Sequence, residues 1–373
     1  MAQAIPPPDL HIPHSKNTVM VSVIDTTAFI GISASKFVEP PMLGNEKLHA
    51  ACYAFLVKHS NPNAESKYDT LLFDLGVRKD IENAPKVLHD MLDDPSVTIK
   101  VDKNVGEILK DNGEDPDGVG AIVWSHWHFD HTGDPSTFPA STDLIVGPGF
   151  KDAYVPAYPT VQDSPVDERA WEGRNLREIK FDTEGQGLTI GQYKAMDLYG
   201  DGSFYLLDTP GHAIGHMCGL ARTSAEPPEF IFMGGDIAHH GGEFRPTKFL
   251  PLPENIVPSP LAAPYSKQAP MCPGSMFEAI HPKQSKTEPF YVPASNGVHK
   301  DAQETKASID KLADFDAQNN VFVNIAHDTS LFDVVEFFPK TANGWSQKQW
   351  KQEGTWRFLR DFETGAEEQR SQS

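Results

Sequence analysis

Short apolar runs recur along the chain and predict β-strands, and two groups of these strands are accompanied by segments with helical spacing. The predicted strands are residues 19–24, 52–58, 70–74, 121–124, 144–146, 204–207, 217–221, 230–233 and 321–325. The predicted helices are residues 81–92, 104–111, 301–316 and 345–362. Two sets of strands with helices beside each set favour a layered α/β/β/α arrangement.

Two long proline-rich stretches interrupt this pattern. Residues from about 149 to 186 and from about 239 to 300 hold many prolines and little regular periodicity. Loops of this length inside a compact domain are usually functional covers or disordered segments. We therefore expect a catalytic domain over residues 1–340 that carries both insertions. We expect residues 341–373 to form a helical tail packed on the same domain.

Composition and charge narrow the possible partners. The 373 residues are 39% hydrophobic, which permits a sizeable core. The formal net charge of -20 argues against nucleic acid as a partner. The chain has 3 cysteines, an odd number, and no CxxC motif, so neither a disulfide framework nor a cysteine-rich zinc site is indicated. We expect no secretory leader and no membrane span. We expect a cytoplasmic protein that acts on a small molecule, and the oligomeric state stays open.

One segment concentrates residues that bind metals. The sequence WSHWHFDHTGD, residues 124–134, directly follows a predicted buried strand. While the chain is extended, His126 and His128 face the same side, and the loop then presents Asp130 and His131 from another direction. Imidazole and carboxylate groups suit zinc and similar divalent ions. The alternative is a histidine-rich surface loop.

Three later segments each place a ligand-type residue at the end of an apolar strand. They are His212 in LLDTPGHAIGH, Asp236 in FIFMGGD and His327 in VFVNIAHD. A single residue of this kind usually caps a turn or lies in solvent. Together with residues 124–134, however, they supply what a second metal would need. Two metals about 3.5–4 Å apart form a known hydrolytic arrangement.

The order HxHxDH, TPGH, strand-ending GD and late AH resembles the metallo-β-lactamase superfamily, over residues from about 19 to 327. The resemblance implies an αββα sandwich with a dinuclear metal site at one edge of the sheets. It also implies two Zn²⁺ ions per chain, although iron, manganese and cobalt stay open. The implied ligands are His126, His128 and His212 for the first metal, Asp130, His131 and His327 for the second, and Asp236 as a bridge.

Two nearby residues are expected to support the ligands. His216 follows His212 by four residues, and in similar proteins the first of two such histidines is the ligand, so we expect His216 to pack or to hydrogen-bond. Asp74 in LLFDLG resembles a family aspartate that orients a ligating histidine, or it is a carboxylate of a strand-end turn.

Within the superfamily the chain is most similar to the N-acyl homoserine lactonase-like branch and to fungal-type lactonases and lactamases. This implies opening of a cyclic ester or cyclic amide by a metal-bridging hydroxide that attacks the carbonyl, with Asp130 or His239 as the proton shuttle. Where lactonases carry a tyrosine three residues after the bridging aspartate, this chain has His239, followed by His240. We expect His239 to contact the carbonyl or to return the proton, and the alternative is a solvated loop.

The alternative function is thioester hydrolysis of the glyoxalase II type, which uses the same ligands but normally adds a basic helical region after them. Here the tail is short and its charges are mixed. Aromatic residues in the loops could line an apolar pocket or could pack within the loops. They are Phe129, Phe150, Tyr154, Tyr158, Tyr265 and Phe290.

Overall fold

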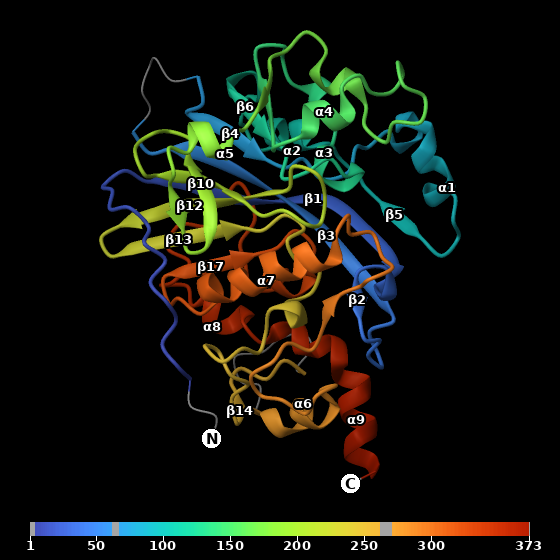
Figure 1. Cartoon of the computed structure of the whole chain (residues 1–373), viewed down its shortest axis with the longest axis vertical. Coiled ribbons are helices and arrows are strands. Elements are labelled where there is room, and N and C mark those ends of the chain that lie inside the picture. Colours follow the sequence, from blue (N-terminus) through green and yellow to red (C-terminus); the bar gives the residue numbers. More distant parts are fainter. Residues whose placement is uncertain (1–3, 62–66, 262–270, 373) are drawn as a thin grey trace.

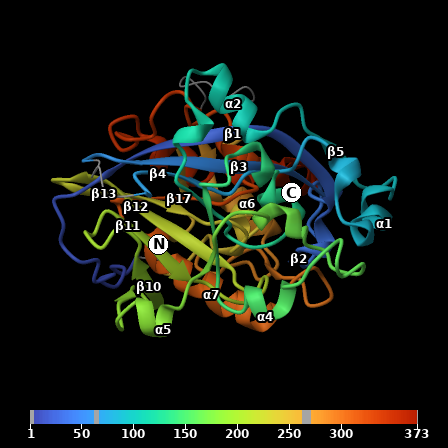
Figure 2. The same cartoon turned by 90° about the horizontal axis from the view of Figure 1, so that it is seen from above.

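Two β-sheets face each other between layers of helices in the computed structural model, which describes residues 4–61, 67–261 and 271–372 (Figures 1 and 2). The larger sheet runs in the order β5 (Thr98–Lys100), β1 (Val19–Ser33), β3 (Lys47–His59), β4 (Thr70–Phe73), β6 (Ala121–Val123), β7 (Asp143–Val146) and β8 (Leu176–Glu178). The smaller sheet runs in the order β17 (Val321–Asn324), β13 (Pro228–Met233), β12 (Met217–Ala225), β11 (Phe204–Asp208), β10 (Tyr193–Asp197) and β9 (Thr189–Ile190). This confirms the predicted αββα sandwich.

Helices cover the outer face of each sheet. The helix α2 (Val105–Asp111) begins with a capping box, in which the Asn104 backbone N–H donates to Glu107 Oε2 at 2.8 Å. On the other side, α7 (Ala302–Asp316) begins where Asp301 Oδ1 accepts from the Glu304 N–H at 2.9 Å. The shorter helices are α1 (His89–Leu92), α3 (Phe129–Thr132), α4 (Phe150–Tyr154), α5 (Phe181–Glu184), α6 (Gly274–Ile280), α8 (Trp350–Gly354) and α9 (Glu363–Gln372).

Alternation along the strands sorts the side chains into three packed layers. The inner faces of the two sheets meet around residues such as Phe55, Phe73 and Leu206. The opposite face of the larger sheet packs on α2 through Leu109, and that of the smaller sheet packs on α7 through Leu312. Because successive strand residues point to opposite faces, strands buried on both sides read as continuous apolar runs. This is why the sequence located most of them.

Several sequence-based boundaries are wrong. Residues 81–92 form two separate 3₁₀ turns and the single turn α1, because Pro85 cannot donate a helical hydrogen bond. The stretch 149–186 was expected to be an irregular insertion, but it contains β8, which pairs in parallel with β7 and extends the larger sheet. The helix predicted over 345–362 is divided into α8 and the 3₁₀ helix Arg357–Phe362, and α9 then continues the chain.

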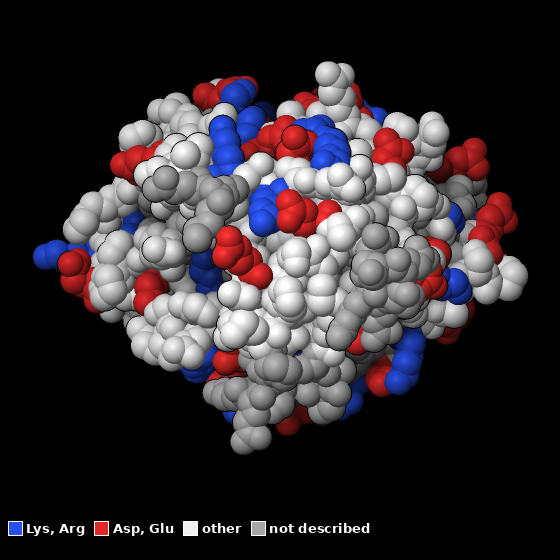
Figure 3. Space-filling view, turned by 90° about the horizontal axis from the view of Figure 1, so that it is seen from below, with Lys and Arg blue, Asp and Glu red and all other residues white. Residues whose placement is uncertain are grey.

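The second proline-rich stretch and the tail pack on the ends of β1 and β3. Their buried side chains, among them Phe277, Phe290 and Phe358, form one cluster with Ile30 and Ala50 of those strands. Two small strand pairs brace this region: β2 (Val38–Glu39) with β16 (Val292–Pro293), and β14 (Asn255–Ile256) with β15 (Cys272–Pro273). Figure 3 shows the face that looks downward in Figure 1, where acidic and basic side chains are interspersed on a mostly uncharged surface.

Within the described residues, no helix has both the length and the apolar character needed to cross a membrane.

We predict that Trp345 is a major contributor to stability. Its side chain is 1% exposed and stacks on Phe322 with ring centroids 5.7 Å apart. Trp345→Ala should lower the free energy of unfolding by about 3–5 kcal/mol, because it leaves a cavity in the core. The control Met20→Ala removes a side chain that is 48% exposed and should cost about 0.5 kcal/mol or less. Chemical denaturation measures both, and equal losses would contradict this account.

Candidate metal centre

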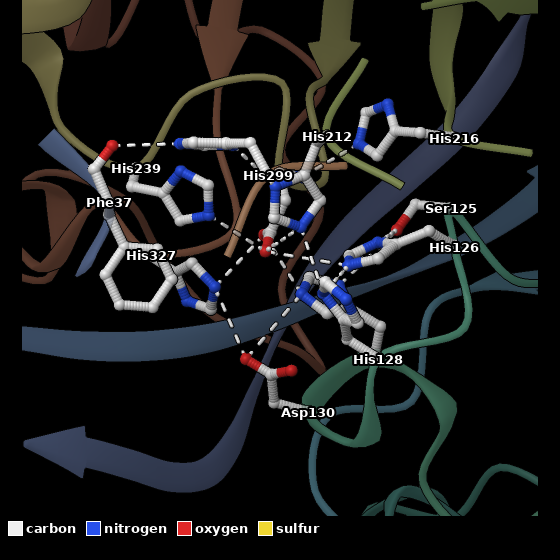
Figure 4. Close-up of polar contacts among 12 residues, drawn as sticks. Phe37, Ser125, His126, His128, Asp130, His212, His216, His239, His299 and His327 are labelled. Carbon is white, nitrogen blue, oxygen red and sulfur yellow. Dashed lines mark hydrogen bonds and ion pairs between the residues drawn. The ribbon is translucent and has the colours of Figure 1, made fainter. Parts of the chain in front are cut away.

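Segments that follow four strands converge at one edge of the two sheets (Figure 4). The strand β6 leads into the loop of His126 and His128 and then into α3, which carries Asp130 and His131. His212 lies between β11 and β12, Asp236 follows β13, and His327 follows β17. The structure therefore brings all seven predicted side chains together. His128 is half-buried and the other six are buried.

Parallel strand pairing explains why the ligands meet. In the smaller sheet, Met233 of β13 is in register with Asn324 of β17, and Asp236 and His327 each follow three residues later. In the larger sheet, Phe73 of β4 is in register with Val123 of β6, so Asp74 comes beside the start of the histidine loop. Carboxyl ends of parallel neighbours lie at the same edge of a sheet, and this edge is the site.

The carboxylate of Asp236 lies at the centre, and its Oδ2 faces one set of imidazoles. Asp236 Oδ2 is 3.6 Å from His126 Nε2 and 3.3 Å from His212 Nε2. His128 Nδ1 is 2.9 Å from His126 Nε2 and 3.0 Å from His212 Nε2. Ligands of a tetrahedral zinc ion with bonds of about 2.0–2.1 Å are about 3.3 Å apart. These four residues have the spacing of a single-metal site.

The Oδ1 of Asp236 faces a second set. Its distances to His131 Nε2 and His327 Nε2 are both 3.0 Å. Asp130 Oδ2 closes this set at 3.4 Å from His327 Nε2 and 3.8 Å from His131 Nε2. Within each of the two sets the potential ligand atoms lie within 4.8 Å of one another, and Asp236 belongs to both. The two oxygens of one carboxylate thus face two adjacent groups of potential ligand atoms.

Unsatisfied atoms show that a cation fits this site. Among the described residues, His131 Nε2 and Asp236 Oδ1 are buried and have no hydrogen-bond partner, although they are only 3.0 Å apart. A buried polar atom without a partner costs about 1–3 kcal/mol, and a divalent ion between the two atoms would satisfy both. The donor set of imidazole nitrogens and carboxylate oxygens is one that zinc accepts.

The pKa values of the histidines differ between the two sets of potential ligands. Burial lowers the pKa of His128 to about 4, and burial together with neighbouring imidazoles holds the pKa values of His126 and His212 well below the ordinary value. These imidazoles are neutral at pH 7, which is the form that binds metals. On the other side, burial opposes a charge, but Asp236 and neighbouring groups raise the pKa values of His131 and His327 well above the ordinary value. The set of ligand atoms around Asp236 Oδ1 therefore favours a positive charge.

Hydrogen bonds from the sandwich orient two of the imidazoles. His131 Nδ1 donates to Asp74 Oδ2 at 2.8 Å, and the Ser125 N–H donates to Asp74 Oδ1 at 2.6 Å. Asp74 therefore lies where the family resemblance places an orienting carboxylate. His327 Nδ1 donates to the Ala51 carbonyl at 2.6 Å. Each bond leaves Nε2 of its histidine free to face Asp236.

His216 forms hydrogen bonds that support the site, which is one of the two roles expected from the sequence. Its Nδ1 donates to the Thr209 carbonyl at 2.9 Å, and its Nε2 accepts from the Asp236 backbone N–H at 3.0 Å. Both ring nitrogens are used, so His216 holds the backbone of Asp236 and has no lone pair left for a metal.

His239 is not part of a solvated loop. It is 2% exposed, its Nε2 is 3.2 Å from Asp236 Oδ2, and its ring lies 4.5 Å from that of Phe37. Its Nδ1 is buried without a hydrogen-bond partner among the described residues. His240 is also buried, but its Nε2 lies 3.2 Å from Asp361 Oδ2 instead. Only the first of the two histidines reaches the proposed metal ligands.

Three residues at the site escaped the sequence-based search. Glu243 Oε2 accepts from the backbone N–H groups of His239 and His240 at 2.5 and 3.1 Å, and burial raises the Glu243 pKa to about 8. His299 Nδ1 lies 3.1 Å from His212 Nδ1, and Phe37 covers His239. Glu243 had a weak signal as an acid that follows two glycines, whereas His299 and Phe37 had none, because they approach only through tertiary folding.

A cavity of about 330 Å³ adjoins the Asp236 cluster through His239 and His327. Its other walls are mostly polar and come from residues 44–49, His240, Gly241, Asp328, Thr329 and Asp361. Of the aromatic residues suggested for an apolar pocket, those within the described residues do not line it. Phe150 and Phe290 are buried in packed clusters, and Tyr265 lies outside the described residues.

Comparison with known proteins gives close sequence relatives and similar folds. No protein-family model matches the chain. It is 51% identical over 358 residues to the gamma-lactamase FDB1 of Fusarium pseudograminearum, covering 95% of this chain and 85% of that protein. It is 43% identical over 366 residues to the metallo-hydrolase mfmC of Annulohypoxylon moriforme, covering 96% and 91%.

A solved structure with a similar fold is a B. thuringiensis AiiA mutant with N-decanoyl-L-homoserine bound at its active site. The TM-score is 0.55 at 16% identity, and the match covers 88% of this chain and 100% of that chain. At this identity the likeness concerns the fold alone.

We predict that the two histidines of the TPGHAIGH turn differ in metal content. His212→Ala should bind one divalent ion fewer per chain than wild type. His216→Ala should keep both ions, with affinity weakened by about 10–100-fold at most, because it removes only support for Asp236. Equilibrium dialysis followed by elemental analysis measures both. The reverse ranking would show that His216 is the ligand.

We predict a pH-dependent effect of Glu243→Gln on stability. Because the pKa of this acid is raised from 4.5 to about 8 in the folded protein, its ionisation makes folding less favourable as the pH rises through that interval. The glutamine variant lacks this penalty, so its free energy of unfolding should gain on wild type between pH 5 and pH 8. Chelator-treated protein is denatured at both pH values. The exposed control Glu254→Gln should show no such gain, and a gain equal to that of Glu243→Gln would contradict the argument.

Proposed function

This chain belongs to the family of fungal gamma-lactamases and metallo-hydrolases within the metallo-β-lactamase superfamily, and from that premise we propose that it is a metal-dependent hydrolase that opens cyclic amides or cyclic esters. The observation that carries the proposal is the position of Asp236, whose two carboxylate oxygens face two separate sets of ligand atoms. The relatives reported above give no support to the thioester alternative.

We assign the proposed ligands to two metal ions according to which oxygen of Asp236 they face. His126, His128 and His212 hold one ion, Asp130, His131 and His327 hold the other, and Asp236 joins them. We propose zinc for both sites, because neutral imidazole and carboxylate are its usual ligands outside cysteine-rich sites. When bound, such a pair supplies a polarised substrate carbonyl and a water whose pKa is lowered towards 7.

The side chains of the site handle the proton. Hydrolysis adds the oxygen of water to the carbonyl carbon, breaks the ring C–N or C–O bond, and delivers a proton to the departing nitrogen or oxygen. Asp130 lies at the edge of the cluster and is 8% exposed, and we propose that it takes a proton from the attacking water. His239 has one buried nitrogen without a partner, which can hydrogen-bond the substrate carbonyl or return the proton to the leaving atom.

The cavity beside His239 and His327 suits a compact, polar ring system. Its volume of about 330 Å³ is at the lower end of ligand pockets, and its walls carry the side chains of Asn45, His49 and Asp328. We propose that the ring enters here and that its carbonyl is directed towards His239 Nδ1. We also propose that residues 1–340 act as the catalytic domain and residues 341–373 as a helical tail packed on it.

The experiment that tests this function is hydrolysis by the purified protein across a panel of lactams, lactones and thioesters, before and after chelation. We predict turnover of at least one cyclic amide or ester, loss of that turnover with chelator, and recovery when two equivalents of zinc are added. Turnover limited to thioesters would overturn the substrate class. Turnover that survives complete metal removal would overturn the metal-dependent mechanism.

We predict that His239 acts in the transition state. His239→Ala should lower kcat by about 10²–10⁴-fold on the substrate identified by the panel, with metal content unchanged. Recovery in His239→Tyr would show that hydrogen bonding to the carbonyl is the main role, and loss in both variants would favour proton transfer. The matched control is His240→Ala, which alters the neighbouring buried imidazole that faces Asp361. Equal effects of His239→Ala and His240→Ala would indicate only a structural role.

A further inference from the structure

We infer that His299 is a positioning residue that fixes His212 in its metal-binding form, so that the proline-rich stretch supports a proposed ligand of the sandwich in addition to supplying His239. The inference rests on the proposed role of His212 as a ligand. Figure 4 shows the His299 ring between the Phe37 carbonyl and the His212 ring. His299 Nε2 is 2.9 Å from Phe37 O, and His299 Nδ1 is 3.1 Å from His212 Nδ1.

The chemistry of the partners sets the direction of both hydrogen bonds. A carbonyl oxygen can only accept, so His299 Nε2 carries the hydrogen that is donated to Phe37. A neutral imidazole with a hydrogen on Nε2 has its lone pair on Nδ1. His299 Nδ1 therefore accepts from the Nδ1–H of His212. The lone pair of His212 is then on Nε2, which faces Asp236 Oδ2 at 3.3 Å.

The partner of His212 differs in origin from the partners of the other oriented ligands. His131 and His327 are held by Asp74 and by the Ala51 carbonyl, which belong to the strands of the sandwich and to the turns that follow them. His212 is held by the side chain of His299, which belongs to the stretch 239–300 and is 87 residues from His212 in sequence. Without His299, either nitrogen of a neutral His212 could carry the hydrogen, and one of the two forms presents N–H to the metal.

Backbone contacts keep the stretch in place without help from the His299 side chain. The Lys300 N–H donates to the His212 carbonyl at 2.9 Å, and the Asp301 N–H donates to the Gly211 carbonyl at 3.0 Å. The Ala294 N–H donates to the Phe37 carbonyl at 2.8 Å. Replacing the imidazole should therefore leave the backbone in position and remove only the tautomer control.

The test compares zinc affinity in wild type, His299→Phe, His299→Asn and Lys300→Ala. Phenylalanine keeps a ring but has no acceptor. Asparagine has an acceptor in the place of Nδ1. Lys300 is exposed and adjacent, so its variant controls for changes to the segment. Competition with a chromophoric chelator should show one of the two ions weakened by about 10–100-fold in His299→Phe, with partial recovery in His299→Asn. Lys300→Ala should match wild type.

Equal weakening of both ions in His299→Phe, or no weakening, would overturn the inference while the proposed function stands. Wild-type protein that binds no metal would instead remove the proposed function. Nitrogen-15 NMR of metal-free wild type is independent of any variant. It should show the His212 hydrogen on Nδ1, and a hydrogen on Nε2 would overturn the inference even if His299→Phe fails to fold.

Discussion

The structure depends on one constraint: a single buried carboxylate, that of Asp236, must present each of its oxygens to a different set of imidazoles. Burial opposes the charge on Asp236, but His131 and His327 outweigh it and hold the Asp236 pKa well below the ordinary value. A buried charge of this kind is tolerable only with close partners. The parallel pairing of β13 with β17 satisfies the constraint, because both strands end at the same edge and deliver Asp236 and His327 together.

Residues around this carboxylate hold the proposed ligands and His239 in position and are not proposed as ligands themselves. His216 holds the Asp236 backbone, Asp74 aligns His131, and Glu243 holds the turn that carries His239. His216 and Asp74 come from turns at the strand ends of the sandwich, whereas Glu243 belongs to the proline-rich stretch. The proline-rich stretch adds His299 from outside the sandwich. The site therefore combines residues of the sandwich with residues of the proline-rich stretch, and His239 and His327 also line the small polar cavity.

The sequence predicted the sandwich and the gathered cluster because both leave local signals. Strands buried on both faces read as apolar runs, and HxHxDH is a dense local motif whose partners follow in a fixed order. The helix over 81–92 was wrong because Pro85 breaks it. His299 and Phe37 could not be found, since their roles exist only after the chain brings distant segments together. Phe150 and Phe290 were ambiguous for the same reason, because an aromatic in a loop has the same sequence pattern whether it packs or binds a ligand.

The most direct test of the central claim is anomalous diffraction from crystals of the zinc-loaded protein. The account predicts two anomalous peaks about 3.5–4 Å apart, with the Asp236 carboxylate between them. One peak should lie among His126, His128 and His212, and the other among Asp130, His131 and His327. A single peak, or two peaks that do not share Asp236, would contradict the account.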